Sequence, residues 1–147
     1  MKEDTDFELF VHIDFDALDA FRDFVWRREL HHLCLVADDN TWDALGARVK
    51  KSLKEEETIV ESVILHGDEV RADEGYVMQV LLPVLPRECV YIAVGSGTLT
   101  DITRFVSHRT ERAFISLPTA PSVDAFASMN SPLVMRGFKQ TFPAQLP

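Results

Sequence analysis

The chain contains 147 residues, of which 46% are hydrophobic and 27% are charged. This length and composition suit one globular domain with its own core and exclude a disordered tail. Asp and Glu outnumber Lys and Arg by 24 to 15, which gives a net charge of -9. Non-specific binding to nucleic acid or to an anionic membrane is therefore not expected, and an anionic ligand would need a local binding device.

Targeting signals and cysteine usage indicate the compartment. No apolar run approaches the roughly 18 residues that cross a bilayer, and the acidic start Met1-Lys2-Glu3-Asp4 lacks the layout of a signal peptide. Cys34 and Cys89 each lie inside an apolar, strand-like run. This placement is typical of buried thiols in a reducing compartment and not of a disulfide framework. We therefore expect a cytoplasmic protein.

Helical and strand-like spacing of apolar residues alternate along the first 117 residues. The spacing predicts helices over 15–30, 41–53, 73–82 and 98–108, and strands over 33–37, 58–65, 89–94 and 113–117. Thr41 is expected to be the N-cap of the second helix. Strands separated by helices of this length predict an α/β fold, with a Rossmann-like, mostly parallel sheet and helices on both faces.

The pattern changes beyond Pro118. The segment 128–147 contains Pro132, Pro143 and Pro147, with two short apolar runs around Arg136-Gly137. This arrangement favours a β-hairpin attached to the sheet over another βα unit.

A hydrophobic strand runs into the turn Gly95-Ser96-Gly97 and then into a helix. Such a turn lets backbone N–H groups approach a pyrophosphate, and the helix N-terminus adds a partial positive charge. The Gly-x-Gly-x-x-Gly fingerprint is incomplete, because Thr100 stands where the third glycine would be. Taken alone, the turn fits a phosphate-binding site and a ligand-free βα turn equally well.

A second polar loop, residues 116–128, follows the next strand. It should emerge at the same carboxyl edge of the sheet, where open α/β sheets bind ligands. Thr119, Ser122 and Ser128 can donate hydrogen bonds to phosphate or amide groups, and Asp124 can accept them from substrate hydroxyls. In the alternative interpretation, Ser122 or Asp124 only caps a following helix in a proline-stiffened loop.

Three strings carry a family resemblance: Gly-Ser-Gly-Thr-Leu-Thr-Asp-Ile-Thr-Arg at 95–104, Leu-Pro-Thr-Ala-Pro-Ser-Val-Asp-Ala-Phe-Ala-Ser at 117–128, and Gly-Phe-Lys-Gln-Thr at 137–141. With residues 36–41 upstream, they resemble the N-terminal half of the sn-glycerol-1-phosphate dehydrogenase family. That family belongs to the superfamily of iron-containing alcohol dehydrogenases, glycerol dehydrogenase and 3-dehydroquinate synthase. The Pro-Thr-Ala-Pro-Ser-x-Asp segment is the specific part, and the glycine turn is shared by the whole superfamily.

The resemblance implies a dinucleotide site and a substrate contact. Asp38 would bind the adenosine ribose diol, which favours NAD over NADP by repelling a 2′-phosphate. Asp124 matches the family's substrate-contacting aspartate. Ala125 replaces a usual glycine and Arg104 a usual lysine. The other cofactor-binding residues implied are Gly95, Ser96, Gly97, Thr98 and Leu99 at the pyrophosphate, Thr119, Ala120, Pro121 and Ser122 beside the nicotinamide, and Ser128.

The implied activity is the NAD- or NADP-dependent interconversion of dihydroxyacetone phosphate and sn-glycerol 1-phosphate, a small phosphorylated ketone and a phosphorylated triol. In the family, a C-terminal helical domain supplies one aspartate and two histidines to a divalent metal, Zn²⁺ or Ni²⁺. No segment of this chain matches that pattern, so no metal ligand is expected here.

We therefore expect residues 1–147 to be the N-terminal NAD(P)-binding domain of a longer enzyme, truncated before the helical metal-binding domain and inactive in isolation. A homo-oligomer is compatible with the sequence. Two alternatives stay open: a glycerol dehydrogenase-like domain and a catalytically inert nucleotide-binding module or fragment.

Overall fold

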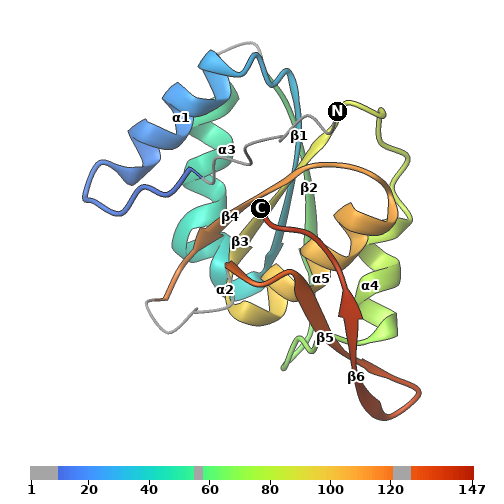
Figure 1. The fold of residues 1–147 in the computed structure, drawn as a ribbon. Coiled ribbons are helices and arrows are strands. Elements are labelled where there is room, and N and C mark those ends of the chain that lie inside the picture. The colour runs from blue at the N-terminus through green and yellow to red at the C-terminus, as the bar shows by residue number, and fades with distance from the viewer. Residues whose placement is uncertain (1–9, 55–57, 121–126) are drawn as a thin grey trace, which may run out of the picture.

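The computed structural model describes residues 10–54, 58–120 and 127–147. In them, four strands form one parallel sheet in the order β2-β1-β3-β4 (Figure 1). The strands are β1 (His32–Asp38), β2 (Ile59–Leu65), β3 (Val90–Gly95) and β4 (Phe114–Pro118). The helices are α1 (Ala17–Arg27), α2 (Asp39–Thr41), α3 (Ala47–Lys54), α4 (Glu74–Leu81) and α5 (Gly97–Arg109), and the π-helical turn η1 (Trp42–Gly46) joins α2 to α3.

Helices cover both faces of the sheet, as the sequence predicted. Successive side chains of a strand point to opposite faces, and in β1 Leu33 and Leu35 pack in one core while Cys34 and Val36 pack in the other. The first core contains residues of α1 and α3, and the second contains residues of α4 and α5. Because β1 is covered on both faces, its central residues are fully buried, which explains its continuous apolar run.

Both cysteines are buried and free. Burial raises the pKa of Cys34 to about 12 and that of Cys89 to about 11. The thiols therefore stay protonated and unreactive at neutral pH, which confirms the prediction that they belong to the core.

The C-terminal hairpin forms as predicted, but it does not extend the sheet. Strands β5 (Asn130–Met135) and β6 (Phe138–Pro143) pair antiparallel with each other in a separate two-stranded sheet. Arg136 and Gly137 join them with φ of 51° and 79°, the backbone of a type I′ turn. Pro132 and Pro143 have no N–H to donate to a longer ladder.

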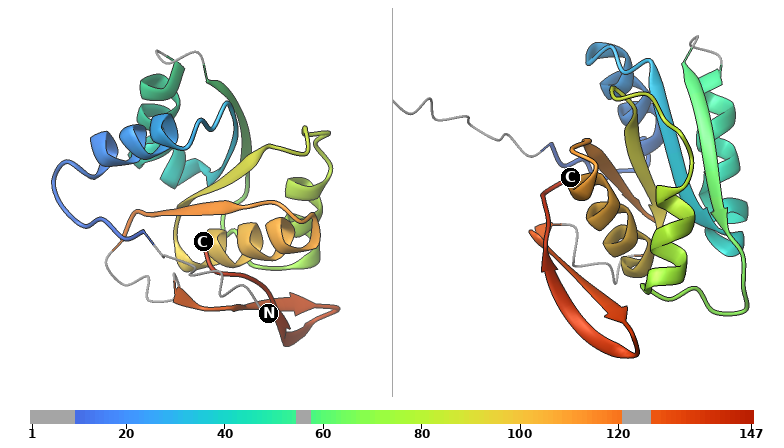
Figure 2. Two further views of the ribbon diagram at one scale, coloured as in Figure 1. Left: turned by 45° about the horizontal axis from the view of Figure 1, so that its top comes forward. Right: turned by 90° about the vertical axis from the view of Figure 1, so that its right-hand side faces the viewer.

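The hairpin packs on the outer side of α5, so that this helix lies between the sheet and the hairpin (Figure 2). Leu133 is 1% exposed in the core shared with α5. The ring of Phe142 meets that of Phe105 on α5 edge to face at 5.4 Å. Val134 N–H donates to the Ala72 carbonyl at 2.7 Å, which ties the hairpin to the segment before α4.

Candidate functional site

The order of strands reverses between β1 and β3, which are hydrogen-bonded neighbours. After β1 the chain reaches β2 through α3 on one face, and after β3 it reaches β4 through α5 on the other face. The segments that leave β1 and β3 therefore diverge at the carboxyl edge, which is where open α/β sheets bind ligands. The predicted site residues Asp38 and Gly95 are the last residues of these two strands.

The β3–α5 turn, residues 95–99, has the backbone of an anion site. Ser96 is the N-cap of α5 and its side chain makes no capping hydrogen bond. The N–H groups of Gly97, Thr98 and Leu99 lie in the first helical turn, where no acceptor exists inside the helix. The first turn contains no acidic residue, and a Cβ added at Gly97 would meet no atom within 4 Å. Open space beside N–H donors that have no acceptor within the helix fits a pyrophosphate.

Glycine is required at position 95 for both conformation and space. Its φ is 147°, in a region that side chains rarely adopt. A Cβ there would collide with Leu99 and lie 2.8 Å from the Thr41 Cγ2 atom. The Gly95 carbonyl accepts a hydrogen bond from Thr119 N–H at 3.2 Å. The turn therefore contacts the segments that follow β1 and β4, and the structure brings these predicted regions together.

Asp38 caps the helix that follows β1. Its Oδ1 accepts from Thr41 N–H at 2.8 Å, and its own N–H donates to Thr41 Oγ1 at 3.0 Å. This is a reciprocal capping box in which Thr41 is the third helical residue. The prediction that Thr41 is the N-cap is wrong, because Asp38 takes that role and the helix begins at Asp39. The other carboxylate oxygen of Asp38 has no hydrogen-bond partner in the described part of the chain and can accept from a ligand.

The loop after β4 is described only in part. Thr119 is exposed and Ala120 is half-buried at the carboxyl edge. Pro121, Ser122 and Asp124 lie outside the described residues. At the far end of the loop, Ser128 Oγ accepts from Asn130 N–H and donates to the Asn130 carbonyl, both at 3.1 Å, so that this hydroxyl shapes the start of β5.

A model of the family described as iron-containing alcohol dehydrogenase matches residues 12–147. The chain belongs to this family. The switch in strand order and the β3–α5 turn described above are features with which open α/β sheets bind ligands.

Curated relatives in this family are similar over most of the chain. Glycerol-1-phosphate dehydrogenase (NAD(P)+) of Geobacillus thermodenitrificans is 40% identical over 140 residues, which are 93% of this chain and 35% of the relative. The enzyme with the same name from Bacillus subtilis is 39% identical over 134 residues, covering 89% of this chain and 34% of the relative. The chain thus spans about a third of the length of these relatives.

Solved structures of a glycerol dehydrogenase and of a 2-deoxy-scyllo-inosose synthase show the same fold. Glycerol dehydrogenase from Schizosaccharomyces pombe matches with a TM-score of 0.74 and 23% identity, over 88% of this chain and 33% of that chain. A 2-deoxy-scyllo-inosose synthase complexed with carbaglucose-6-phosphate, NAD+ and Co2+ matches with a TM-score of 0.75 and 16% identity, over 88% of this chain and 38% of that chain.

The sequence did not predict the buried ion pair of Asp101 and Arg104 in this chain. Arg104, which is fully buried, lies 3.3 Å from Asp101 on α5 and donates to the Asn130 carbonyl at the start of β5, also at 3.3 Å. Burial raises the pKa of Asp101 to about 6, against the opposing effect of Arg104. Burial also lowers the pKa of Arg104. The pair joins the helix of the candidate phosphate site to the hairpin.

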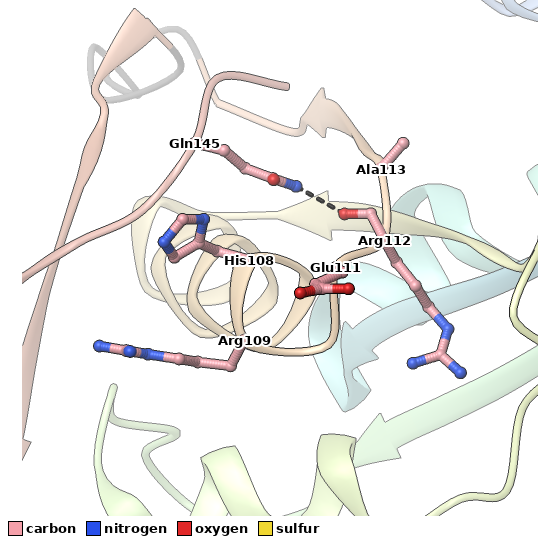
Figure 3. A pocket seen from close by; sticks show the side chains of 6 residues that line it. All are labelled: His108, Arg109, Glu111, Arg112, Ala113 and Gln145. Atoms are coloured by element: carbon pink, nitrogen blue, oxygen red, sulfur yellow. Dashed lines mark hydrogen bonds between the residues drawn. The ribbon is translucent and has the colours of Figure 1, made fainter.

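A surface hollow lies at the opposite end of α5, far from the carboxyl edge (Figure 3). It has a volume of about 660 Å³. Its lining residues are His108, Arg109, Glu111, Arg112, Ala113 and Gln145. The Gln145 amide donates to the Arg112 carbonyl at 2.6 Å, so one wall of the hollow is the last segment of the chain. None of the predicted site residues lines it.

Across residues 10–54, 58–120 and 127–147, no group of three or more His, Cys, Asp or Glu side chains is placed to hold a metal ion. In the same ranges no helix is long and apolar enough to cross a membrane.

Proposed function

We propose that residues 1–147 form the NAD(P)-binding domain of a metal-dependent dehydrogenase that interconverts dihydroxyacetone phosphate and sn-glycerol 1-phosphate. The observation that carries this proposal is the agreement between the β3–α5 turn at the switch in strand order and the family of the chain. The relatives named glycerol-1-phosphate dehydrogenase support the choice of substrate, because they are about 40% identical over nearly the whole chain.

In this proposal, residues at three strand ends contact different parts of the cofactor. The N–H groups of the β3–α5 turn would bind the pyrophosphate, helped by the positive end of the α5 dipole. The unpaired oxygen of Asp38 would accept hydrogen bonds from the adenosine ribose. Thr119 and Ala120, with Pro121 and Ser122, would line the nicotinamide side.

The substrate contact in this proposal is Asp124, whose carboxylate would accept hydrogen bonds from substrate hydroxyls, and Ser128 would contribute at the cofactor side. When bound, the nicotinamide supplies or accepts the hydride, and a divalent metal, Zn²⁺ or Ni²⁺, polarises the substrate oxygen. The described residues do not fit a metal site. We therefore propose that the metal ligands are supplied from outside the described residues.

The compartment in this proposal is the cytoplasm. It is supported by the two buried cysteines, which are free thiols and not a disulfide.

Calorimetric titration of the 147-residue chain with NADH and NADPH tests the cofactor assignment directly. We expect saturable binding, weaker than in a complete enzyme because a cofactor between two domains loses part of its surroundings in an isolated one. The absence of binding at millimolar concentrations of both cofactors would contradict the proposal.

The substrate assignment needs a protein that contains the rest of the enzyme. In a chimera, residues 1–147 replace the matching segment of the Geobacillus thermodenitrificans relative, and Zn²⁺ or Ni²⁺ is added. We expect oxidation of sn-glycerol 1-phosphate and much slower oxidation of glycerol. A folded chimera that binds NADH but prefers free glycerol would indicate a glycerol dehydrogenase instead.

A further inference from the structure

A hydrogen-bonded pair, His66 and Asp39, lies beside the proposed position of the adenosine ribose at Asp38. The register of the sheet pairs Asp38 of β1 with Leu65 of β2, so Asp39 and His66 are the first residues beyond these neighbouring strands. Their side chains meet, because His66 Nδ1 lies 2.8 Å from Asp39 Oδ1. Both side chains are open to solvent, at 72% and 57% exposure, and they follow directly after two paired strand ends, so they are accessible to a ligand at this edge of the sheet.

The backbone of His66 is held in place although its ring is exposed. The hydroxyl of Tyr76, on α4, donates to the His66 carbonyl at 3.1 Å. Gly67 has a φ of 152°, and a Cβ there would collide with the same hydroxyl. The close approach of the loop to α4 therefore depends on glycine at position 67. This approach fixes the backbone from which the His66 side chain extends.

The hydrogen bond to Asp39 also decides which ring nitrogen faces a ligand. With hydrogen on Nδ1, the imidazole donates to Asp39, and Nε2 has no partner in the part of the chain that the structure describes. A neutral imidazole then presents Nε2 as an acceptor, which can take a hydrogen bond from a ribose 2′-hydroxyl. A protonated imidazole presents Nε2–H as a donor, which can make a charge-assisted hydrogen bond to a 2′-phosphate.

The other charged or titratable groups nearby in the chain do not take over this role. They are Asp38 after β1, Tyr76 on α4, and Asp68, Glu69 and Arg71 in the loop after β2. Arg71 donates to Glu69 at 2.6 Å, and a guanidinium has no acceptor for a ribose 2′-hydroxyl. His66 is the group in this set that can present either an acceptor or a cationic donor.

We propose that His66, oriented by Asp39, sets the relative affinity of the site for NADP and NAD. The inference rests on the proposed function and deepens it. Asp38 alone would repel a 2′-phosphate, whereas an imidazole that can accept or donate accommodates both cofactors. The relatives carry NAD(P)+ in their names, which is the behaviour that such a residue would produce.

Two substitutions test this with opposite signs. His66→Asn removes an imidazole N–H that is charged when the ring is protonated, and it should weaken NADP+ binding about tenfold, near the lower end for a hydrogen bond to a charged group. NAD+ binding should change less than about threefold, because a neutral hydrogen bond is weaker. Asp39→Asn keeps an acceptor for the ring and removes a negative charge, so NADP+ should bind several-fold more tightly and NAD+ equally well. Both dissociation constants are measured by calorimetry on the 147-residue chain.

His31→Asn is the matched control, because His31 is an exposed histidine before β1, at the opposite edge of the sheet. It should leave both dissociation constants unchanged. If His66→Asn binds NAD+ normally and keeps the original preference between NADP+ and NAD+, the assignment of His66 is overturned while the proposed function stands. If the unsubstituted chain binds neither cofactor, the proposed function and this inference fall together.

Discussion

The two ends of α5 differ in how their backbone groups are satisfied. At the C-terminal end, Thr110 N–H and Thr110 Oγ1 both donate to the Val106 carbonyl, and Arg112 N–H donates to the Ser107 carbonyl. The Gln145 amide adds hydrogen bonds to the Arg112 carbonyl and to Ser107 Oγ. At the N-terminal end, the Ser96 side chain does not cap the helix and Gly97 faces open space.

The hollow and the N–H groups proposed to bind an anion lie at opposite ends of α5. The hollow of Figure 3 lies at the end where helix carbonyls concentrate negative charge and where the chain itself already provides partners. The N-terminal end offers N–H donors and a positive dipole to an anion. The proposed cofactor site therefore rests on unsatisfied backbone groups and not on concave shape.

The largest effect on stability is expected at Gly95, the last residue of β3, which is closely packed against Leu99 and Thr41. Gly95→Ala places a side chain at a φ of 147° and against Leu99 and Thr41. Strain and overpacking together should lower the free energy of unfolding by about 2–5 kcal/mol. Urea denaturation measures the change. A variant as stable as the original chain would show that this turn relaxes freely.

The ion pair in the middle of α5 should make stability depend on pH. Burial raises the pKa of Asp101 from 3.8 to about 6, so the folded chain holds this proton more tightly than the unfolded chain. The contribution of Asp101 to stability is therefore fully present below its ordinary pKa and falls as pH rises through about 6. The loss should be on the order of 3 kcal/mol.

Urea denaturation of the original chain and of Asp101→Asn at about pH 4 and about pH 7 isolates this contribution from the other carboxylates. The stability of the original chain relative to the variant should fall between the two pH values. A difference that does not change with pH would contradict the placement of Asp101 beneath the hairpin.

A smaller effect, on binding and not on folding, is expected at Gly97. Gly97→Val fills the open space beside the first-turn N–H groups, and NADH should bind at least about tenfold more weakly, or about 1.4 kcal/mol. Stability should change by less than about 0.5 kcal/mol, because a Cβ at this position meets no atom within 4 Å. Ala113→Val, at the other end of α5, is the matched control and should leave NADH affinity unchanged. Unchanged NADH affinity in Gly97→Val would contradict the assignment of the pyrophosphate to this turn.

The smallest effect is expected at the C-terminal end. Gln145→Ala removes the hydrogen bonds to the Arg112 carbonyl and to Ser107 Oγ. The free energy of unfolding should fall by about 1 kcal/mol, as measured by urea denaturation, and NADH affinity should stay the same. A loss of NADH affinity in this variant would mean that the two ends of α5 are coupled.

The sequence was sufficient for the sheet and for the position of the β3–α5 turn. Apolar periodicity located each βαβ strand, and the handedness of βαβ units restricts where the connecting helices can lie. The sequence also placed Asp38 at a strand end, although it did not distinguish a ligand contact from a helix cap. Both roles use the same carboxylate, and only the geometry shows that one oxygen is occupied by Thr41.

The polar side of α5 could not be predicted from periodicity. Thr100, Thr103, Arg104 and Ser107 are all fully buried, whereas a helical pattern assigns such residues to solvent. They are buried because the hairpin, which lies more than twenty residues further along the chain, covers that side of the helix. A contact between segments so distant in sequence leaves no local signal, so the ion pair of Asp101 and Arg104 was also missed.

The hairpin on the outer side of α5 has an electrostatic consequence for the site. A helix on the surface has water along one side, and water weakens the field at its ends. Here protein lies on both sides of the helix, so less of its field passes through solvent. The partial positive charge at Ser96 and Gly97 should therefore act on an anion more strongly than that of an exposed helix of the same length. In a chain with a net charge of -9, such insulation allows an anion to bind without a cluster of basic side chains.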